Sequence, residues 1–180
     1  DLPPARGDGA PASSLVDVQN SARILFALAG KPELPVMVAS SGGYGFLCRL
    51  ADMVSNRKAG REFMTLEPGE VPVAPVVYAE SSAAMVAALS AGGRLLVFDI
   101  GEMRSVARGR GVIVMGLDDG EALVAATPIA GKSVKVMGSG RGGKEKLIEI
   151  SGVKFEHYLG RRARMGRVLP DKLKPTGFAQ

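Results

Sequence analysis

Arginine, lysine and glycine gather in three stretches of the chain, and these residue types could bind phosphate groups. The stretches are "MVSNRKAGREF" (53–63), "MRSVARGRGVI" (103–113) and "VKFEHYLGRRARMGRVL" (153–169). An arginine side chain can hold a phosphate through two hydrogen bonds, and glycine lets backbone amides approach it closely. The candidate contacts to a polyanion are Arg57, Lys58, Arg61, Arg104, Arg108, Arg110, Arg161, Arg162, Arg164 and Arg167. The alternative is that these are solvated loops whose arginines only keep the protein soluble.

Two other stretches resemble nucleotide-binding loops. "ATPIAGKS" (126–133) satisfies the loose form of the phosphate-binding loop, and "GSGRGGKE" (138–145) lacks only its Ser or Thr. Such a loop must lead from a strand into a helix, whose first turn faces the phosphates. Strand-like sequences follow both stretches, so we do not expect a nucleotide or any other cofactor.

Histidine is too scarce for most catalytic and metal sites. His157 is the single histidine, which excludes His-rich zinc sites and a catalytic triad with a second histidine. His157, Tyr158 and Arg161 could form a tyrosine nucleophile with its helpers, but that chemistry also needs a metal held by clustered carboxylates. The nearby acids are only Glu149 and Glu156. We expect no catalytic residue and no metal in this chain. The simpler interpretation of Tyr158 is a partly buried aromatic side chain in a loop.

Charge is unevenly distributed along the 180 residues. The net charge is +5, yet residues 141–180 hold ten Lys or Arg and four Asp or Glu, while residues 1–140 hold 13 basic and 14 acidic residues. The basic field is therefore local. The single cysteine, Cys48, cannot form an internal disulfide and is expected to be a buried thiol, which favours a reducing compartment.

No apolar run approaches the roughly 18 residues of a membrane helix, and no signal peptide opens the chain. We expect a soluble, cytoplasmic protein without a membrane partner. Because the sequence begins at Asp1 without an initiator methionine, we also expect a fragment of a longer domain.

A repeat of about 50 residues organises the chain. A double glycine recurs at 42–43, 92–93 and 142–143, and similar runs follow it: "FLCRL" (46–50), "LVFDI" (96–100) and "KLIEI" (146–150). A second series, 51 residues apart, comprises Arg6, Arg57 and Arg108, then Gly9, Gly60 and Gly111, then Leu15, Leu66 and Leu117. The repeat units are roughly 1–53, 54–103, 104–150 and 151–180. Equivalent connections of an array emerge on the same rim, so the three basic stretches should form one stripe.

Each unit is predicted to form four strands. "VIVMGL" (112–117) and "EALVAAT" (121–127) flank an Asp-Gly turn, which predicts a hairpin, and "SVKVM" (133–137) with "KLIEI" predicts another. Four strands in about 50 residues is the size of a propeller blade. The fold class is therefore all-β, a propeller-like array of four-stranded blades. About three and a half units are fewer than the ~4–8 blades of a closed ring, so the ring should be open or partial.

Helices are the alternative for two segments. "ARILFALAG" (22–30) and "SSAAMVAALSAGG" (81–93) are rich in alanine and leucine, which favour helix. However, the repeat aligns "AAMVAALSAGG" with the strand-like "PVMVASSGG" (35–43). This alignment favours strands.

Three stretches carry a resemblance to a known family. "SSGGYGFLCRLADMVSNRKAGREFMTLEPGE" (40–70), "SAGGRLLVFDIGEMRSVARGRGVIVMGL" (90–117) and "GRRARMGRVL" (160–169) closely resemble the C-terminal domain of the A subunit of bacterial DNA topoisomerase IV. The resemblance implies a β-pinwheel whose outer rim binds and bends double-stranded DNA and tunes which DNA topology the enzyme acts on. It implies that the strand-passing tyrosine lies elsewhere in the A subunit, that the partner B subunit carries the ATPase, and that the enzyme acts on the chromosome in the bacterial cytoplasm.

The related gyrase A subunit carries a strict Gln-Arg-Arg-Gly-Gly-Lys-Gly box on one loop between blades. This sequence has only degenerate versions, at 57–60, 108–111 and 161–166. The departure favours topoisomerase IV over gyrase and argues against full chiral wrapping of DNA.

The main hypothesis is non-sequence-specific duplex DNA binding through the ten candidate side chains, by a domain that is not an enzyme alone. The second is a propeller-like module that docks an acidic protein. A third is RNA binding with "GSGRGGK" (138–144) as a flexible basic tip.

Overall fold

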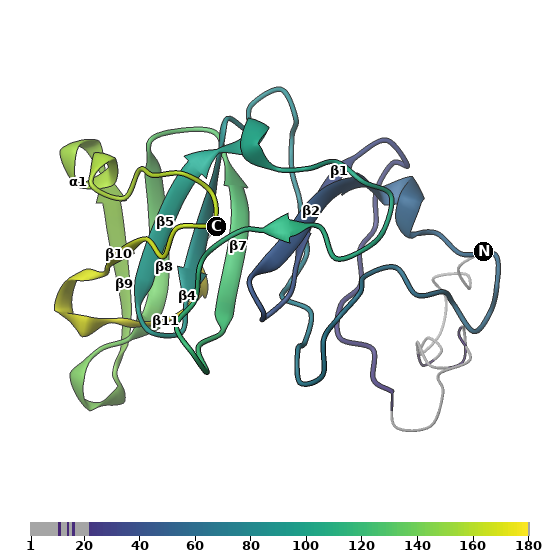
Figure 1. Cartoon of the computed structure of the whole chain (residues 1–180), viewed down its shortest axis with the longest axis horizontal. Helices are drawn as coiled ribbons and strands as arrows, with labels where there is room; N and C mark the ends of the chain where they lie inside the picture. The colour runs from purple at the N-terminus through teal and green to yellow at the C-terminus, as the bar shows by residue number, and fades with distance from the viewer. Residues whose placement is uncertain (1–10, 12–13, 15, 17–21, 180) are drawn as a thin grey trace.

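Three antiparallel sheets make up the described part of the chain, which in this computed structural model comprises Pro11, Ser14, Val16 and residues 22–179. Sheet 1 has the order β3 (Val76–Val77), β1 (Pro35–Ala39), β2 (Tyr44–Arg49), β6 (Val112–Ile113). Sheet 2 has the order β10 (Arg167–Val168), β5 (Arg94–Asp99), β4 (Met85–Ser90), β7 (Leu123–Ile129). Sheet 3 has the order β11 (Lys174–Phe178), β8 (Ser133–Ser139), β9 (Glu145–Ser151). Figure 1 shows the sheets along the longest axis of the molecule.

Helical structure is confined to short turns in the described residues. The α-helix α1 (Gly152–Glu156) follows β9, and 3-10 turns occur at Leu50–Met53, Ile100–Glu102, Arg141–Gly143 and Pro170–Lys172. The all-β prediction is confirmed. Residues 81–93 contain β4 rather than a helix, and residues 22–30 form neither helix nor strand. Arg6, Gly9 and Leu15, the first members of the 51-residue series, lie outside the described residues.

The double-glycine repeat corresponds to a repeated hairpin. The pairs β1–β2, β4–β5 and β8–β9 each turn at a double glycine whose second member has positive φ: +82° at Gly43, +85° at Gly93 and +75° at Gly143. Each of these glycines donates its amide to the carbonyl three residues earlier, at 3.0, 3.0 and 3.1 Å. Residues with a Cβ rarely adopt this φ, which explains why glycine recurs there.

The outer strand of the first two sheets comes from a later part of the chain. β6 pairs with β2 through Tyr44 and Ile113, and β10 pairs with β5 through Leu95 and Arg167. Sheet 3 has no such strand among the described residues, so β9 forms its edge.

The predicted hairpin between 112–117 and 121–127 is therefore wrong. β6 belongs to sheet 1, whereas β7 belongs to sheet 2 and pairs with β4, with Ala126 opposite Ala88. The Asp-Gly turn does form, since Glu121 N donates to Asp118 O at 2.9 Å, but it connects two sheets. Pairing with β4 places β7 in sheet 2, where Leu123 and Ala126 are buried, so tertiary context overrides turn propensity. The hairpin between 133–137 and 146–150 is confirmed, with Val134 opposite Ile150.

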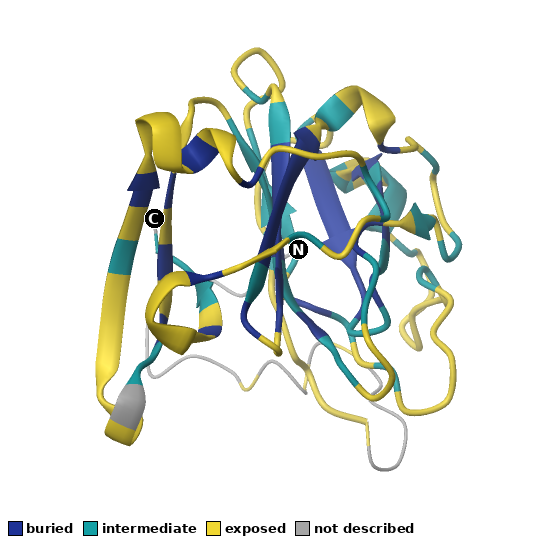
Figure 2. Cartoon of the chain, turned by 60° about the vertical axis from the view of Figure 1, so that its left-hand side comes forward, coloured by how far each residue is buried: buried dark blue, intermediate teal, exposed yellow. Residues whose placement is uncertain are grey.

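Sheet 2 is buried on both faces, which explains its continuous apolar strands. Alternate side chains of β4 point to opposite faces. Val86 and Ala88 pack with sheet 1, while Ala87 and Leu89 pack with sheet 3. In Figure 2 the buried colour follows these central strands, and the connecting segments are mostly exposed.

The third sheet buries only one face. Val134 and Val136 of β8 are buried, whereas Lys135 and Met137 between them are exposed. This alternation differs from β4 and is what a sheet with one solvated face shows. Sheet 3 thus ends the stack of described sheets.

Candidate nucleic-acid interface

The second basic stretch runs along the outer edge of β2. Leu47 N donates to Arg104 O at 2.9 Å, and Val106 N donates to Leu47 O at 2.9 Å. These two bonds form a parallel bridge between Leu47 and Ser105. Residues 104–106 therefore cover the sheet edge through backbone groups, and the arginine side chain of Arg104 is not needed for that contact.

The third basic stretch has the equivalent place on β5. Val97 N donates to Tyr158 O at 2.9 Å, and Gly160 N donates to Val97 O at 2.8 Å. Val97 lies 50 residues after Leu47. The repeat therefore places the second and third stretches at corresponding positions on successive sheets.

Neighbouring basic stretches are also bonded to each other. Gly109 N donates to Phe63 O at 3.0 Å, and Thr65 N donates to Gly109 O at 3.1 Å. On the other side, Arg162 Nη1 of the third stretch donates to Ile113 O at 2.7 Å, and just beyond the second stretch Ala163 N donates to Val114 O at 3.1 Å and Gly116 N donates to Arg164 O at 3.0 Å. The structure thus brings the three stretches together side by side. We call residues 53–65, 103–113 and 153–169 the basic rim.

Two glycines allow the rim to approach the sheets closely. Gly111 has φ +80°, and a Cβ there would lie 2.1 Å from Gly45 O. Gly166 has φ +73°, and a Cβ there would lie 2.4 Å from Leu95 O. Both positions need glycine for conformation and for space.

Seven of the ten predicted side chains point to solvent without an ionic partner. No carboxylate among the described residues lies within 4.0 Å of their charged nitrogens. They are all exposed: Arg57, Lys58, Arg104, Arg108, Arg161, Arg164 and Arg167. Their charge is available to an external anion.

The other three predicted side chains are engaged within the protein. Arg110 forms ion pairs with Glu67 and with Glu70, the latter at 3.0 Å, and its guanidinium lies 4.0 Å from the centre of the Tyr44 ring. Arg162 Nη1 donates to Ile113 O at 2.7 Å, and Arg61 donates to Asp52 O. These contacts tie the rim to itself and to the sheets.

Tyr158 and Cys48 are both buried and protonated. Tyr158 OH donates to Val168 O at 3.4 Å, and burial raises the pKa of Tyr158. His157 is exposed and meets the Tyr158 ring edge-on. Burial, with a smaller effect of Asp52, raises the pKa of the Cys48 thiol to about 11. An inward-facing phenol does not suit a nucleophile, and Cys48 is the buried strand thiol that was predicted.

The two loop-like sequences lie between strands. Residues 126–133 run from β7 into β8, and residues 138–145 form the tip between β8 and β9. No helix follows either stretch directly, so neither has the geometry of a phosphate-binding loop. Among the described residues no three His, Cys, Asp or Glu side chains are grouped so as to hold a metal.

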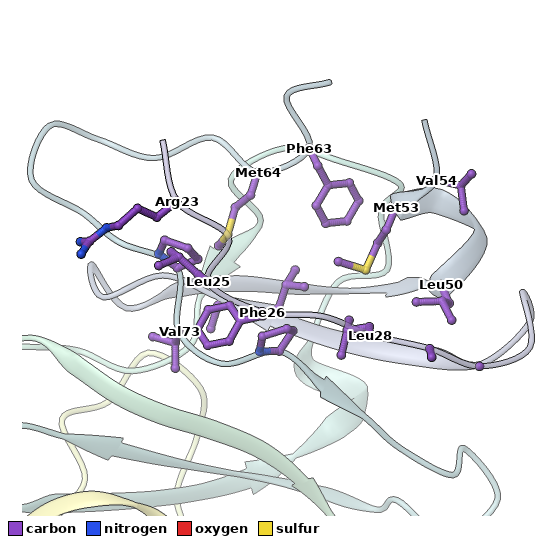
Figure 3. Close-up of a pocket in the computed structure, with 16 residues that line it drawn as sticks. Arg23, Leu25, Phe26, Leu28, Leu50, Met53, Val54, Phe63, Met64 and Val73 are labelled. Carbon is purple, nitrogen blue, oxygen red and sulfur yellow. The ribbon is translucent and has the colours of Figure 1, made fainter. Parts of the chain in front are cut away.

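Sequence reasoning missed an apolar cavity of about 730 Å³ on the outer face of sheet 1. Phe26 and Leu28 line one side, and Phe63 and Met64 of the rim line the other (Figure 3). Among the described lining residues Arg23 is the one that is charged, and none of them is an acid, a general base or a nucleophile.

Comparison with known proteins places this architecture in a family. The model described as "DNA gyrase C-terminal domain, beta-propeller" matches residues 35–71 and 84–130. The A subunit of DNA topoisomerase 4 from Neisseria gonorrhoeae is 36% identical over 174 residues, covering 94% of this chain and 22% of that protein. Its counterpart of the same name from Pseudomonas aeruginosa is 29% identical, covering 94% of this chain and 23% of that protein.

Solved structures show the same fold. The C-terminal domain of E. coli ParC superposes with a TM-score of 0.82 at 22% identity, covering 94% of this chain and 69% of that domain. The C-terminal domain of a DNA topoisomerase IV gives 0.73 at 18% identity, covering 95% of this chain and 54% of the other.

The chain is thus an all-β array of the propeller type found in gyrase C-terminal domains. Its sequence similarity lies with the A subunits of DNA topoisomerase IV, which confirms the resemblance seen in the sequence. It spans less than a quarter of the length of these relatives. No helix in the described ranges is long and apolar enough to cross a membrane.

Proposed function

We propose that this chain is a DNA-binding domain that holds the sugar-phosphate backbone of duplex DNA along its basic rim. The observation that carries the proposal is the side-by-side arrangement of three basic stretches with seven exposed Lys or Arg side chains, none of which has a carboxylate of the described residues within 4.0 Å. These cations can displace condensed counterions from DNA, which favours binding to any sequence.

The rim lacks the features of base readout. Apart from Arg167, which begins the edge strand β10, its arginines lie on loops rather than on a helix or a two-stranded ribbon that could enter the major groove. Side chains on such loops reach phosphate oxygens, which fix position and carry no sequence information. Binding should therefore be nearly independent of sequence.

Bending and a preference for DNA topology belong to the same proposal. A duplex that contacts all three stretches has to follow them across successive sheets, and supercoiled DNA already contains bent and crossed segments.

We propose that the domain is a non-catalytic accessory part of a topoisomerase IV A subunit. Through the rest of that chain it would act with the ATPase B subunit. We also propose that residues 1–180 form one repeat domain within a larger C-terminal region.

A salt series with linear and supercoiled duplexes tests the proposal. If all seven exposed side chains contact phosphates, log K against log salt should have a slope near −6, at about 0.9 per contact. Unrelated sequences should bind equally and supercoiled DNA should bind more tightly. Weak duplex binding at low salt, together with a partner that survives nuclease treatment, would favour the acidic-protein alternative. A preference for RNA in direct competition would favour the RNA-binding alternative.

A further inference from the structure

A four-residue turn from a later part of the chain lies beside each of the three hairpin tips, which are the double-glycine turns of β1–β2, β4–β5 and β8–β9. The turns are 67–70, 118–121 and 170–173, and in each the fourth residue donates its amide to the first carbonyl, at 2.9, 2.9 and 3.2 Å. The third residues have positive φ: Gly69 at +86°, Gly120 at +75° and Lys172 at +51°. The turns therefore repeat in place, and the third differs in conformation, because Asp171 before Lys172 also has positive φ (+56°) whereas Pro68 and Asp119 do not.

The first two turns set a carboxylate against a tip glycine. Glu121 Oε1 accepts the Gly92 amide at 2.7 Å. Glu70 lies so close to Gly42 that an added Cβ would be 1.7 Å from its Oε1. An acidic side chain thus closes each of these tips.

The third tip differs in charge and in space. Leu173 replaces the glutamate and is buried in the core, 1% exposed. A Cβ added at Gly142 would meet nothing within 4 Å. The third tip is therefore open where the first two are closed.

Lysines outnumber acids around this open tip. Lys144, Lys146 and Lys172 line a hollow of about 800 Å³ together with Gly140, Glu145, Leu169 and Asp171. Lys146 pairs with Asp171. Lys144 and Lys172 are exposed, and no carboxylate in the described ranges lies within 4.0 Å of either.

Backbone strain supports a functional role for Lys172. A residue with a Cβ is disfavoured at φ +51°, and the two earlier turns have glycine at this place. A strained residue that could be glycine is a reason to look for a function of its side chain. The hollow also continues the basic rim, since its lining residue Leu169 directly follows the β10 strand that carries Arg167.

We propose that the third hairpin tip is an additional anion site, at which Lys144 and Lys172 hold a phosphate of the DNA backbone as the duplex leaves the basic rim. The inference rests on the proposed duplex binding and extends its contact surface. It assigns the site to phosphate because Lys144 and Lys172, which no carboxylate of the described residues approaches within 4.0 Å, line a roomy hollow, whereas the equivalent places in the first two units are occupied by carboxylates.

The test compares two double variants of equal charge in the full chain. Lys144→Ala with Lys172→Ala should reduce the log-log salt slope by about two units. The control, Lys31→Ala with Lys135→Ala, removes two exposed lysines outside the basic rim, one before β1 and one on the solvated face of β8, and should change the slope by less than about half a unit. Circular dichroism and thermal unfolding check that both variants are folded.

Lys172→Gly separates the side chain from the backbone. Glycine relieves the strain, so this variant should unfold at a higher temperature than the wild type while binding DNA more weakly. Lower stability together with unchanged binding would show that Lys172 is only a structural residue and would overturn the inference.

The outcomes distinguish the inference from the proposed function. If the wild type binds duplex with a steep salt slope but Lys144→Ala/Lys172→Ala matches its control, the tip site is wrong and the rim stands. If the wild type shows no salt-dependent duplex binding, both are wrong. If the tip variant keeps its DNA affinity but loses affinity for poly-glutamate, the tip serves an acidic protein and the phosphate assignment is overturned.

Discussion

Replacing Arg104 and Arg108 together by alanine should weaken duplex binding and leave the fold intact. Both side chains are exposed and have no carboxylate within 4.0 Å among the described residues. The segment is held to β2 by the carbonyl of Arg104 and the amide of Val106, which alanine retains. The change therefore removes charge from the rim without releasing the rim from the sheet.

The expected size follows from two lost phosphate contacts. At about 0.9 per contact, the log-log salt slope should fall by about 1.8. The ratio of the wild-type binding constant to that of the variant should then fall about 12-fold as the salt concentration rises from about 50 to 200 mM. Stability should change by less than about 0.5 kcal/mol, as for most surface substitutions.

Arg110→Ala is the matched comparison, two residues from Arg108 on the same loop. It removes the partner of Glu67 and Glu70, and the Glu70 side chain is only 12% exposed. Leaving that carboxylate unpaired should cost about 1–3 kcal/mol, or roughly 2–12 °C in melting temperature for a chain of this size. Its effect on the salt slope should be below about half a unit, because this charge is already neutralised.

Fluorescence anisotropy on two unrelated duplexes, with thermal unfolding of each variant, measures both quantities. A loss confined to one duplex would refute backbone binding. A slope change for Arg110→Ala as large as that of the double variant would show that Arg110 leaves its glutamates when DNA binds, which would refute the division into free and engaged arginines.

Three further predictions concern the fold and can be measured by urea unfolding. Gly111→Ala should lower the free energy of unfolding by about 2–5 kcal/mol, because a Cβ at φ +80° would lie 2.1 Å from a carbonyl oxygen. Gly60→Ala, at φ +70° with free space around the new Cβ, should lower it by only about 1–2 kcal/mol. Equal losses would contradict the close approach of the rim to the sheet. Phe98→Ala should cost about 3–5 kcal/mol because the ring is fully buried between sheets 1 and 2. Because burial raises the pKa of Cys48 from 9.0 to about 11, the unfolded chain loses this proton first, and stability should fall by about 1–2 kcal/mol as pH rises from 9 to 11. Cys48→Ala should lack that part of the pH dependence, and an unchanged slope would contradict the assignment.

The repeat and its hairpins could be predicted because their cause is local. Gly43, Gly93 and Gly143 each adopt a positive φ within their own turn, and the strands on either side pair directly across it. The exchange of strands between sheets could not be predicted in this way. Nothing near Val112 or Ile113 specifies their partners on β2, which lie 67 and 69 residues earlier.

The candidate site was predictable in composition but not in the roles of its members. Arg108 and Arg110 are separated by one glycine and look equivalent in the sequence. Their difference depends on Glu67 and Glu70, which lie 43 and 40 residues before Arg110. The Glu70 turn is repeated at Glu121, so its recurrence could have identified both as structural acids.

The rim explains how a regular fold can carry an irregular set of arginines. Backbone bonds at Leu47 and Val97 attach the rim to successive sheet edges, so the side chains on its outer surface can differ between units without loosening the attachment. The third residue of that series, Leu147 on β9, has no such covering in the described chain and is 57% exposed, whereas Val97 is fully buried. Covering a sheet edge is thus the structural role of the rim, and the arginines use a position that the fold needs in any case.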